Sequence, residues 1–222
     1  MSYRLNGEWI LTAAIPYLEA TRLENGVPDK HISGLSDIVI GARYSPWKKE
    51  DGPLSNLSFN FGLILPTGES KDNPTTGLIA PSVFQLGTGT TQLRLGANDY
   101  GSITDNLSYF SSLNITFPLY ESHKEFLPAE TLFFRAGIGY SISEKWSTKL
   151  SLDFFHGEHD EFIGSDIQNT GSTNLSITPS IIYSINDELS ASISAAIPVY
   201  RRVNKTALAI DTLWNLGISY QF

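Results

Sequence analysis

Six charged side chains could act on a passing solute, because they fall on the polar side of alternating stretches of the chain. They are Asp37, Arg43, Arg94, Arg135, Lys149 and Asp153. If several of them lie at one height around a hollow wall, they form an electrostatic constriction that selects anions or polar solutes, as charged rings do in pores. The alternative is that these groups pair with one another as structural ion pairs. We expect the four cations of this set to determine selectivity.

A second candidate for chemistry is the stretch HGEHDE, in which His156 and His159 stand among carboxylates. Imidazole and carboxylate groups could together bind a divalent cation. A His-x-x-His spacing in a loop fixes no ligand geometry, so a solvated acidic loop is the simpler interpretation. The histidines all fall in or beside expected loops, which leaves no Ser-His pair among the strand residues for nucleophilic catalysis. We therefore expect no metal, no cofactor and no enzyme activity.

Alternation of apolar and polar residues positions these groups, and it recurs along almost the whole chain. In the terminal stretch LWNLGISYQF, successive strand side chains point to opposite sides, so Leu216, Ile218, Tyr220 and Phe222 share one face. Ten strands are expected on this basis, at 9–15, 36–45, 56–65, 90–99, 106–117, 131–142, 146–156, 173–185, 188–199 and 211–222.

The polar faces of these strands indicate a membrane barrel. They are rich in Ser, Thr, Asn and Gly, whereas the outer face of a soluble β-protein is rich in Lys and Glu. Segments of about ten residues with one apolar and one polar face are typical of transmembrane β-barrels, whose polar face lines the lumen. No stretch reaches the roughly 18 apolar residues that a membrane-spanning helix needs. The sequence predicts an all-β, antiparallel transmembrane β-barrel. A soluble barrel with a ligand in its cavity would need the apolar faces inside.

The composition bounds the rest of the prediction. A chain of 222 residues with 41% hydrophobic and 17% charged residues suits one folded domain, 1–222. The formal net charge of -8 argues against nucleic acid as a partner, because phosphate binding needs clusters of Lys and Arg.

Link lengths and aromatic residues support the barrel. Short links such as SISEK and SINDE alternate with long ones, as the periplasmic turns and external loops of outer-membrane barrels do. Aromatic residues beside the short links are expected to form an interfacial girdle. These are Trp9, Tyr44, Tyr140, Trp146, Tyr183, Tyr220 and Phe222.

Two repeated sequence units predict where strands end. SYRLNGEW matches GYSISEKW and IYSINDEL, so residues 2–4 should end a descending strand whose partner lies upstream. This predicts a native barrel of twelve strands, with an N-terminal hairpin and a signal peptide outside this chain. Prolines recur at the far ends of the ascending strands, where the missing backbone donor marks the end of pairing. They are Pro16, Pro66, Pro118 and Pro198.

The segment 66–89 is too apolar for a free loop. It could fold inward as a plug or gate, cap the rim, or pack on a neighbouring subunit. The candidate plug or gate residues are Leu78, Ile79, Val83 and Phe84.

Three stretches, SGLSDIVIGARY, NFGLILPTGE and FQLGTGTTQLRLGA, resemble an outer-membrane barrel family named after the meta-pathway of phenol degradation. Members typically show a Gly-Asp before a strand, a Leu-Pro-Thr-Gly strand end and a Gln-Pro-Gly-Thr-Gly turn. This chain has Ser36 before Asp37, and Leu86 where proline is usual.

The resemblance implies a bacterial outer-membrane channel for small molecules, including hydrophobic or aromatic compounds, or in distant relatives a channel that exports a polypeptide. The partners it implies are outer-membrane lipid, a small-molecule solute and the barrel assembly machinery. An alternative from the binding class is a non-conducting barrel that anchors external loops for adhesion or assembly.

Overall fold

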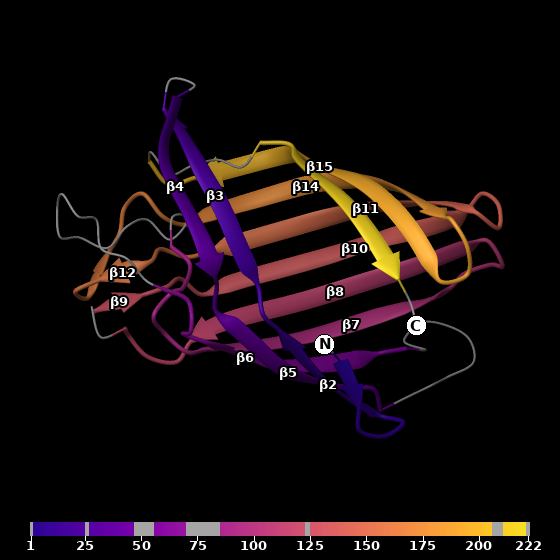
Figure 1. The fold of residues 1–222 in the computed structure, drawn as a ribbon, viewed down its shortest axis with the longest axis horizontal. Helices are drawn as coiled ribbons and strands as arrows, with labels where there is room; N and C mark the ends of the chain where they lie inside the picture. Colours follow the sequence, from indigo (N-terminus) through magenta and orange to yellow (C-terminus); the bar gives the residue numbers. More distant parts are fainter. Residues whose placement is uncertain are drawn as a thin grey trace.

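The fold is an antiparallel sheet of eleven strands, in the order β1-β2-β5-β6-β7-β8-β10-β11-β14-β15-β16 (Figure 1). The computed structural model describes residues 2–24, 27–46, 56–69, 85–122, 125–205 and 211–220. The strands of this sheet are β1 (Ser2–Arg4), β2 (Trp9–Ala14), β5 (Ile38–Tyr44), β6 (Ser58–Leu65), β7 (Gln92–Ser102), β8 (Leu107–Pro118), β10 (Thr131–Ser141), β11 (Trp146–Gly157), β14 (Ser172–Ser184), β15 (Leu189–Val203) and β16 (Leu213–Tyr220). No helix among the described residues is long and apolar enough to cross a membrane.

The expected strands are confirmed. Each of the ten alternating stretches contains one strand of the main sheet, and the short strand at residues 2–4 is also present as β1. The pairing is antiparallel between all neighbours in the sheet. The two edge strands, β1 and β16, therefore run in the same direction, and no pairing between them occurs among the described residues.

Two parts of the long connections differ from the prediction. The link after β2, expected as a loop, forms a hairpin of β3 (Tyr17–Glu24) and β4 (Val27–Leu35) that stands away from the main sheet (Figure 1). Two other links together form a small sheet of β9 (Phe126–Leu127), β12 (Glu161–Phe162) and β13 (Ser165–Asp166). These strands were missed because they are short or carry charged residues without regular alternation.

The expectation that pairing ends at Pro198 is wrong for β15. The strand continues to Val203, and its register with β14 shifts between Leu175 and Ser176, the partner of Pro198. A proline that cannot donate to the ladder is accommodated at such a bulge. The other three rim prolines do lie at or just beyond the ends of β2, β6 and β8.

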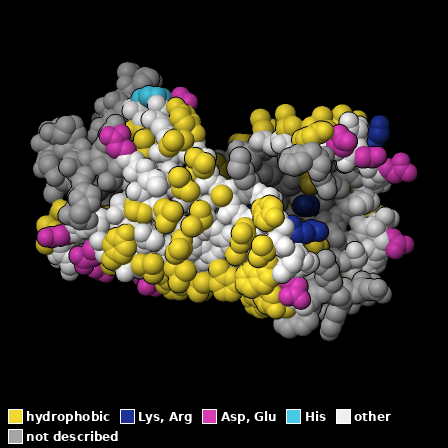
Figure 2. Space-filling model, turned by 60° about the horizontal axis from the view of Figure 1, so that its bottom comes forward, with side chains coloured by type: hydrophobic (Ala, Val, Ile, Leu, Met, Phe, Trp, Pro, Cys, Tyr) yellow, Lys and Arg dark blue, Asp and Glu magenta, His cyan; other side chains and the backbone are white. Residues whose placement is uncertain are grey.

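The two faces of the sheet have the polarity expected of a membrane barrel. Alternate residues such as Phe61, Phe134 and Leu152 have exposed side chains on the outer face. Apolar side chains cover much of this face (Figure 2). On the inner face, the buried side chains include Ser151, Asp153 and Thr178. Figure 2 also shows a hollow at one end of the molecule, with Lys and Arg side chains in its depth. In transmembrane β-barrels, a face of the first kind meets lipid and a face of the second kind lines the lumen.

The short turns all lie at one end of the strands and the long connections at the other. We call these the short-turn end and the long-loop end. At the short-turn end, the rings of Trp9 and Tyr44 stack with centroids 4.7 Å apart, and those of Trp146 and Tyr183 lie 4.6 Å apart. Tyr140 and Tyr220 are exposed nearby. The structure thus places these expected girdle residues at the short-turn end, while Phe222 lies outside the described residues.

Candidate functional site

The inner wall has an uninterrupted register across β8, β10, β11 and β14, which stacks side chains in layers. Counted toward the short-turn end from the first layer that contains a Phe, the first layer contains Asn114, Phe133, Phe155 and Asn174, and the second contains Ser112, Arg135, Asp153 and Ser176. The third layer contains Phe110, Gly137, Ser151 and Thr178, and the fourth contains Ser108, Gly139, Lys149 and Ser180. Charged and aromatic layers therefore alternate along the wall.

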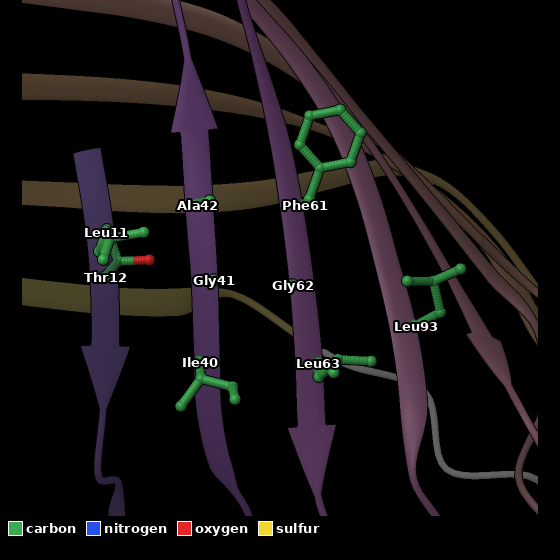
Figure 3. Close-up of a pocket in the computed structure, with 9 residues that line it drawn as sticks. All are labelled: Leu11, Thr12, Ile40, Gly41, Ala42, Phe61, Gly62, Leu63 and Leu93. Atoms are coloured by element: carbon green, nitrogen blue, oxygen red, sulfur yellow. The ribbon is translucent and has the colours of Figure 1, made fainter. Parts of the chain in front are cut away.

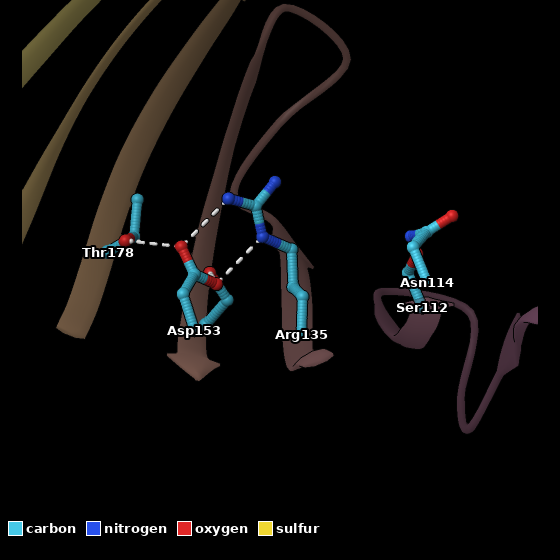
Figure 4. A network of polar contacts seen from close by, with 6 residues as sticks. Ser112, Asn114, Arg135, Asp153 and Thr178 are labelled. Carbon is cyan, nitrogen blue, oxygen red and sulfur yellow. Dashed lines mark hydrogen bonds and ion pairs between the residues drawn. The ribbon is translucent and has the colours of Figure 1, made fainter. Parts of the chain in front are cut away.

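The second layer contains the expected cation Arg135 and the expected carboxylate Asp153, and the structure joins them (Figure 4). The Arg135 Nε and Nη2 groups donate to Asp153 Oδ1 and Oδ2 at 2.7 and 2.8 Å. The hydroxyls of Ser151 and Thr178 donate to the same carboxylate at 2.9 and 2.8 Å. The side chain of Asp153 is 8% exposed, whereas that of Arg135 is 42% exposed. The carboxylate is fixed in the wall, and the guanidinium still faces the lumen.

The other three expected cations have no carboxylate partner among the described residues. Arg43 Nε donates to Asn60 Oδ1 at 3.2 Å, and Arg94 Nε donates to Thr116 Oγ1 at 3.4 Å. Lys149 Nζ lies 5.8 Å from the centre of the Phe110 ring. Neutral partners orient these side chains and leave their charge in place. The described wall around β5 to β11 therefore has more positive than negative charge, although the four cations belong to different layers and form no single ring.

The aromatic layers were missed by the sequence analysis, which assigned a polar inner face. Phe133 and Phe155 are direct partners across β10 and β11, and both point inward. Phe110 also faces the lumen, because a Cβ atom added to Gly137 would lie 2.6 Å from its ring. The doublets Phe133-Phe134 and Phe154-Phe155 carried the signal. In an alternating strand, one member of a Phe-Phe pair must face the lumen.

Asp37 lies at the long-loop end, where it joins the three stretches that carry the family resemblance. Gly68 N–H donates to Asp37 Oδ1 at 2.9 Å, and the N–H and hydroxyl of Thr88 donate to Oδ2 at 2.9 and 3.0 Å. Asp37 is 6% exposed. A Cβ atom added to Gly87 would lie 2.5 Å from Asp37 Oδ1, so only glycine permits this approach. We call this arrangement the Asp37 junction. Its carboxylate is occupied by backbone and hydroxyl donors.

The described residues 85–91 follow the segment expected to form a plug. Gln85, Leu86 and Thr90 are buried, and the Thr91 and Tyr120 hydroxyls lie 2.7 Å apart. A cavity of about 200 Å³ lies between this stretch and Phe126 of β9. The plug candidates Leu78, Ile79, Val83 and Phe84 lie outside the described residues.

The two candidate metal ligands have separate partners in the described structure. His156 hydrogen bonds with Thr173 Oγ1 at 2.9 Å and Glu158 Oε1 at 3.1 Å, whereas His159 Nε2 lies 3.2 Å from Asn204 Nδ2. No group of three or more His, Cys, Asp or Glu side chains that could hold a metal ion occurs in the described ranges.

Asp160, beside His159, holds two long connections together. Its Oδ1 accepts a hydrogen bond from Ala129 N–H at 2.8 Å, and its own N–H donates to Thr170 Oγ1 at 2.8 Å. Burial raises the pKa of Asp160 above 3.8, and the Ala129 hydrogen bond and the His159 charge oppose that effect.

A groove of about 570 Å³ lies on β2, β5, β6 and β7 (Figure 3). It is lined by Leu11, Thr12, Ile40, Gly41, Ala42, Phe61, Gly62, Leu63 and Leu93. Leu11, Ile40 and Phe61 are exposed on the outer face of the sheet. This groove therefore belongs to the apolar surface and not to the charged inner wall.

Comparison with known proteins places these features in a family. The family profile described as "Putative MetA-pathway of phenol degradation" matches residues 3–209. The crystal structure of an outer membrane channel from Pseudomonas putida F1 matches with a TM-score of 0.76 at 12% identity, covering 99% of this chain and 79% of that one. No curated protein matches the sequence.

Proposed function

We propose that this chain, which belongs to the MetA-pathway phenol-degradation family, lets small molecules cross the outer membrane passively. The premise is its membership of that family together with its fold, which is that of an outer-membrane channel. The proposal assigns transport and no catalysis to the chain. Hydrophobic or aromatic compounds are the first solutes to test, because the family description refers to phenol degradation.

The observation that carries the proposal is the excess of positive charge on the inner wall. In the described structure, only Arg135 among the four expected cations has a carboxylate partner. Unpaired charge on a wall that faces lipid or a packed core would be costly, because a buried charge needs a partner. The same charge in a hydrated lumen costs little and attracts anions. The wall therefore fits a path for anionic or polar solutes.

The size of the sheet supports a narrow path. Eight strands leave an interior that side chains can fill, and about sixteen leave an open aqueous channel. Eleven strands lie between these limits. The Asp37 junction and the largely buried residues 85–91 occupy the long-loop end, which favours restricted or gated access there.

Single-channel recording in planar bilayers tests the proposal. The refolded protein should give stable current steps with a preference for anions. A variant with Arg43, Arg94, Arg135 and Lys149 all replaced by Gln should keep the steps and lose that preference. Absence of steps from a protein that migrates as a folded, heat-modifiable barrel would contradict the channel function.

One observation favours a second function. The long connections of the described structure form a hairpin and a three-stranded sheet rather than irregular loops. Ordered external elements suit a barrel that anchors loops for adhesion or assembly, and a closed lumen in the recording would favour that alternative. An export channel for a polypeptide would instead show block of the current by an extended peptide.

A further inference from the structure

The inner wall of β8, β10 and β11 combines aromatic rings and cations in a repeated order. Phe133 stands one layer from Arg135, and Phe110 stands one layer from Lys149. The Arg135 guanidinium carbon lies 5.3 Å from the centre of the Phe133 ring, and Lys149 Nζ lies 5.8 Å from the centre of the Phe110 ring. Both separations are within the range of cation–π attraction. We call these four residues the aromatic–cation strip.

Both cations of the strip can still bind an anion. Arg135 uses Nε and Nη2 for Asp153, and its Nη1 has no hydrogen-bond partner among the described residues. Lys149 has three donors and, within the described structure, neither an ion pair nor a hydrogen bond. The side chains of both residues lie on the inner face of the sheet, where Figure 4 shows Arg135 pointing toward Asp153.

The rings beside these cations are also available to a solute. Phe110 and Phe133 are neither fully buried nor as exposed as the lipid-facing Phe134, which is 41% exposed. Phe155 on β11 is the direct cross-strand partner of Phe133, and this pairing widens the apolar surface next to Arg135. Aromatic rings attract another ring through offset or edge-to-face contact, in addition to the effect of the apolar area that they bury.

We propose that the aromatic–cation strip is a binding subsite for anionic solutes whose charged group is attached to an aromatic ring, such as aromatic carboxylates. The ring of the solute contacts Phe110 or Phe133, and its carboxylate takes the free donors of Lys149 or Arg135. This inference rests on the proposed channel function for the access of the solute to the lumen. It adds the solute class and the residues that recognise it.

Neither half of the strip recognises such a solute alone. A small anion such as acetate uses the cations but leaves the rings uncovered, and a neutral ring such as benzyl alcohol uses the rings but leaves the ammonium and guanidinium donors without an anion. Benzoate matches both halves. The alternative is that the rings only pack against the cations and stabilise the wall, in which case solutes with and without a ring should bind alike.

Binding is measured first, because it does not depend on conduction. Saturation-transfer NMR on the refolded full chain in detergent micelles compares benzoate, acetate and benzyl alcohol at equal concentration. Lys149→Gln removes one cation, and Lys145→Gln in the exposed turn between β10 and β11 is its matched control. Phe133→Leu removes one ring, and its lipid-facing neighbour Phe134→Leu is the control. Phe110→Leu is a second ring variant.

We expect benzoate to bind more tightly than either comparator. Lys149→Gln and each luminal Phe→Leu variant should weaken benzoate binding by roughly three-fold or more, which corresponds to the loss of one cation or ring contact. The two control variants should leave benzoate binding unchanged. Heat-modifiable migration on a gel establishes that each variant is folded.

Equal binding of the three probes, or equal losses in control and luminal variants, would overturn the subsite. Recording the chloride current of the same proteins then separates the two proposals. Current without selective benzoate binding would remove the subsite and keep the channel. Selective binding without current would keep the subsite and remove passive passage.

Discussion

The ion pair between Arg135 and Asp153 predicts an unequal response when either partner is neutralised. Arg135→Gln leaves the Asp153 carboxylate buried, with only the hydroxyls of Ser151 and Thr178 as donors. Asp153→Asn instead leaves a guanidinium whose side chain is 42% exposed and can be solvated by lumen water. The neutral amide can still accept from one hydroxyl. Arg135→Gln should therefore be the more destabilising change.

The magnitudes follow from burial. Removing one partner of a buried pair costs about 3–5 kcal/mol because an uncompensated charge remains. The side chain of Arg135 is 42% exposed, so we expect about 3 kcal/mol for Arg135→Gln, near the lower limit of that range. Asp153→Asn should cost about 1 kcal/mol, the value of one hydrogen bond lost without a stranded buried charge. Lys149→Gln, which breaks no ion pair among the described residues, should change stability by less than about 0.5 kcal/mol.

The assay is urea unfolding of the protein folded in lipid vesicles, followed by tryptophan fluorescence and gel migration. The unfolding midpoint should be highest for Lys149→Gln, lower for Asp153→Asn and lowest for Arg135→Gln. An Asp153→Asn variant as unstable as Arg135→Gln would refute the argument, because it would mean that the guanidinium, and not the carboxylate, is the group that needs its partner. Asp153→Asn should also raise anion preference in bilayer recordings, since it removes negative charge from the lumen.

Gly87→Ala should disrupt the Asp37 junction and cost about 1–3 kcal/mol of stability, because the added Cβ would lie 2.5 Å from Asp37 Oδ1. Gly7→Ala, whose added Cβ would have no neighbour within 4 Å, should have little effect. The unfolding midpoints of the two variants test this difference. Burial raises the pKa of Asp160, so protonation of this carboxyl stabilises the folded state. The stability of the surrounding loops should therefore fall as pH rises from 3.8 through the folded pKa. Hydrogen exchange of these loops should show that pH dependence in the native protein and lose it in Asp160→Asn. Trp146→Leu should cost about 0.5–1.5 kcal/mol by removing the ring that lies 4.6 Å from Tyr183; an unchanged unfolding midpoint would show that the pair contributes nothing to the girdle.

The main sheet could be predicted because strand alternation is a local property of the sequence. Stretches such as 131–142 and 146–156 alternate along most of their length, with the Phe-Phe doublets as the exceptions, and β10 and β11 match them within a residue or two. The hairpin of β3 and β4 follows no such pattern, since apolar and charged residues do not alternate regularly in the stretches YLEATRLE and VPDKHISGL. Its strands depend on pairing with each other, which single-strand periodicity does not report. The bulge at Pro198 is a tertiary adjustment of the same kind.

The candidate site was predicted in part. Strand parity places Arg43, Arg94, Arg135, Lys149 and Asp153 on the inner face, as expected from the sequence. The partner of Asp153 could not be identified, because Arg135 and Asp153 are 18 residues apart in the sequence and their pairing depends on the register between β10 and β11. Asp37 was expected in the lumen wall together with these residues, but its carboxylate binds backbone donors at the two ends of the long connection between β6 and β7. Register and loop closure, and not residue type, separate the two aspartates.

The sign of the charge that a solute meets is also decided by strand parity rather than by composition. The chain has a formal net charge of -8, yet the described inner wall has an excess of cations. Acidic residues such as Glu144, Glu158 and Glu188 lie in the turns and long connections and are exposed. Exposed charges are screened over about 8–10 Å at ordinary ionic strength, so a solute within the barrel responds mainly to the nearby wall. An acidic protein can therefore present a cationic path, because alternate residues of a few strands face that path.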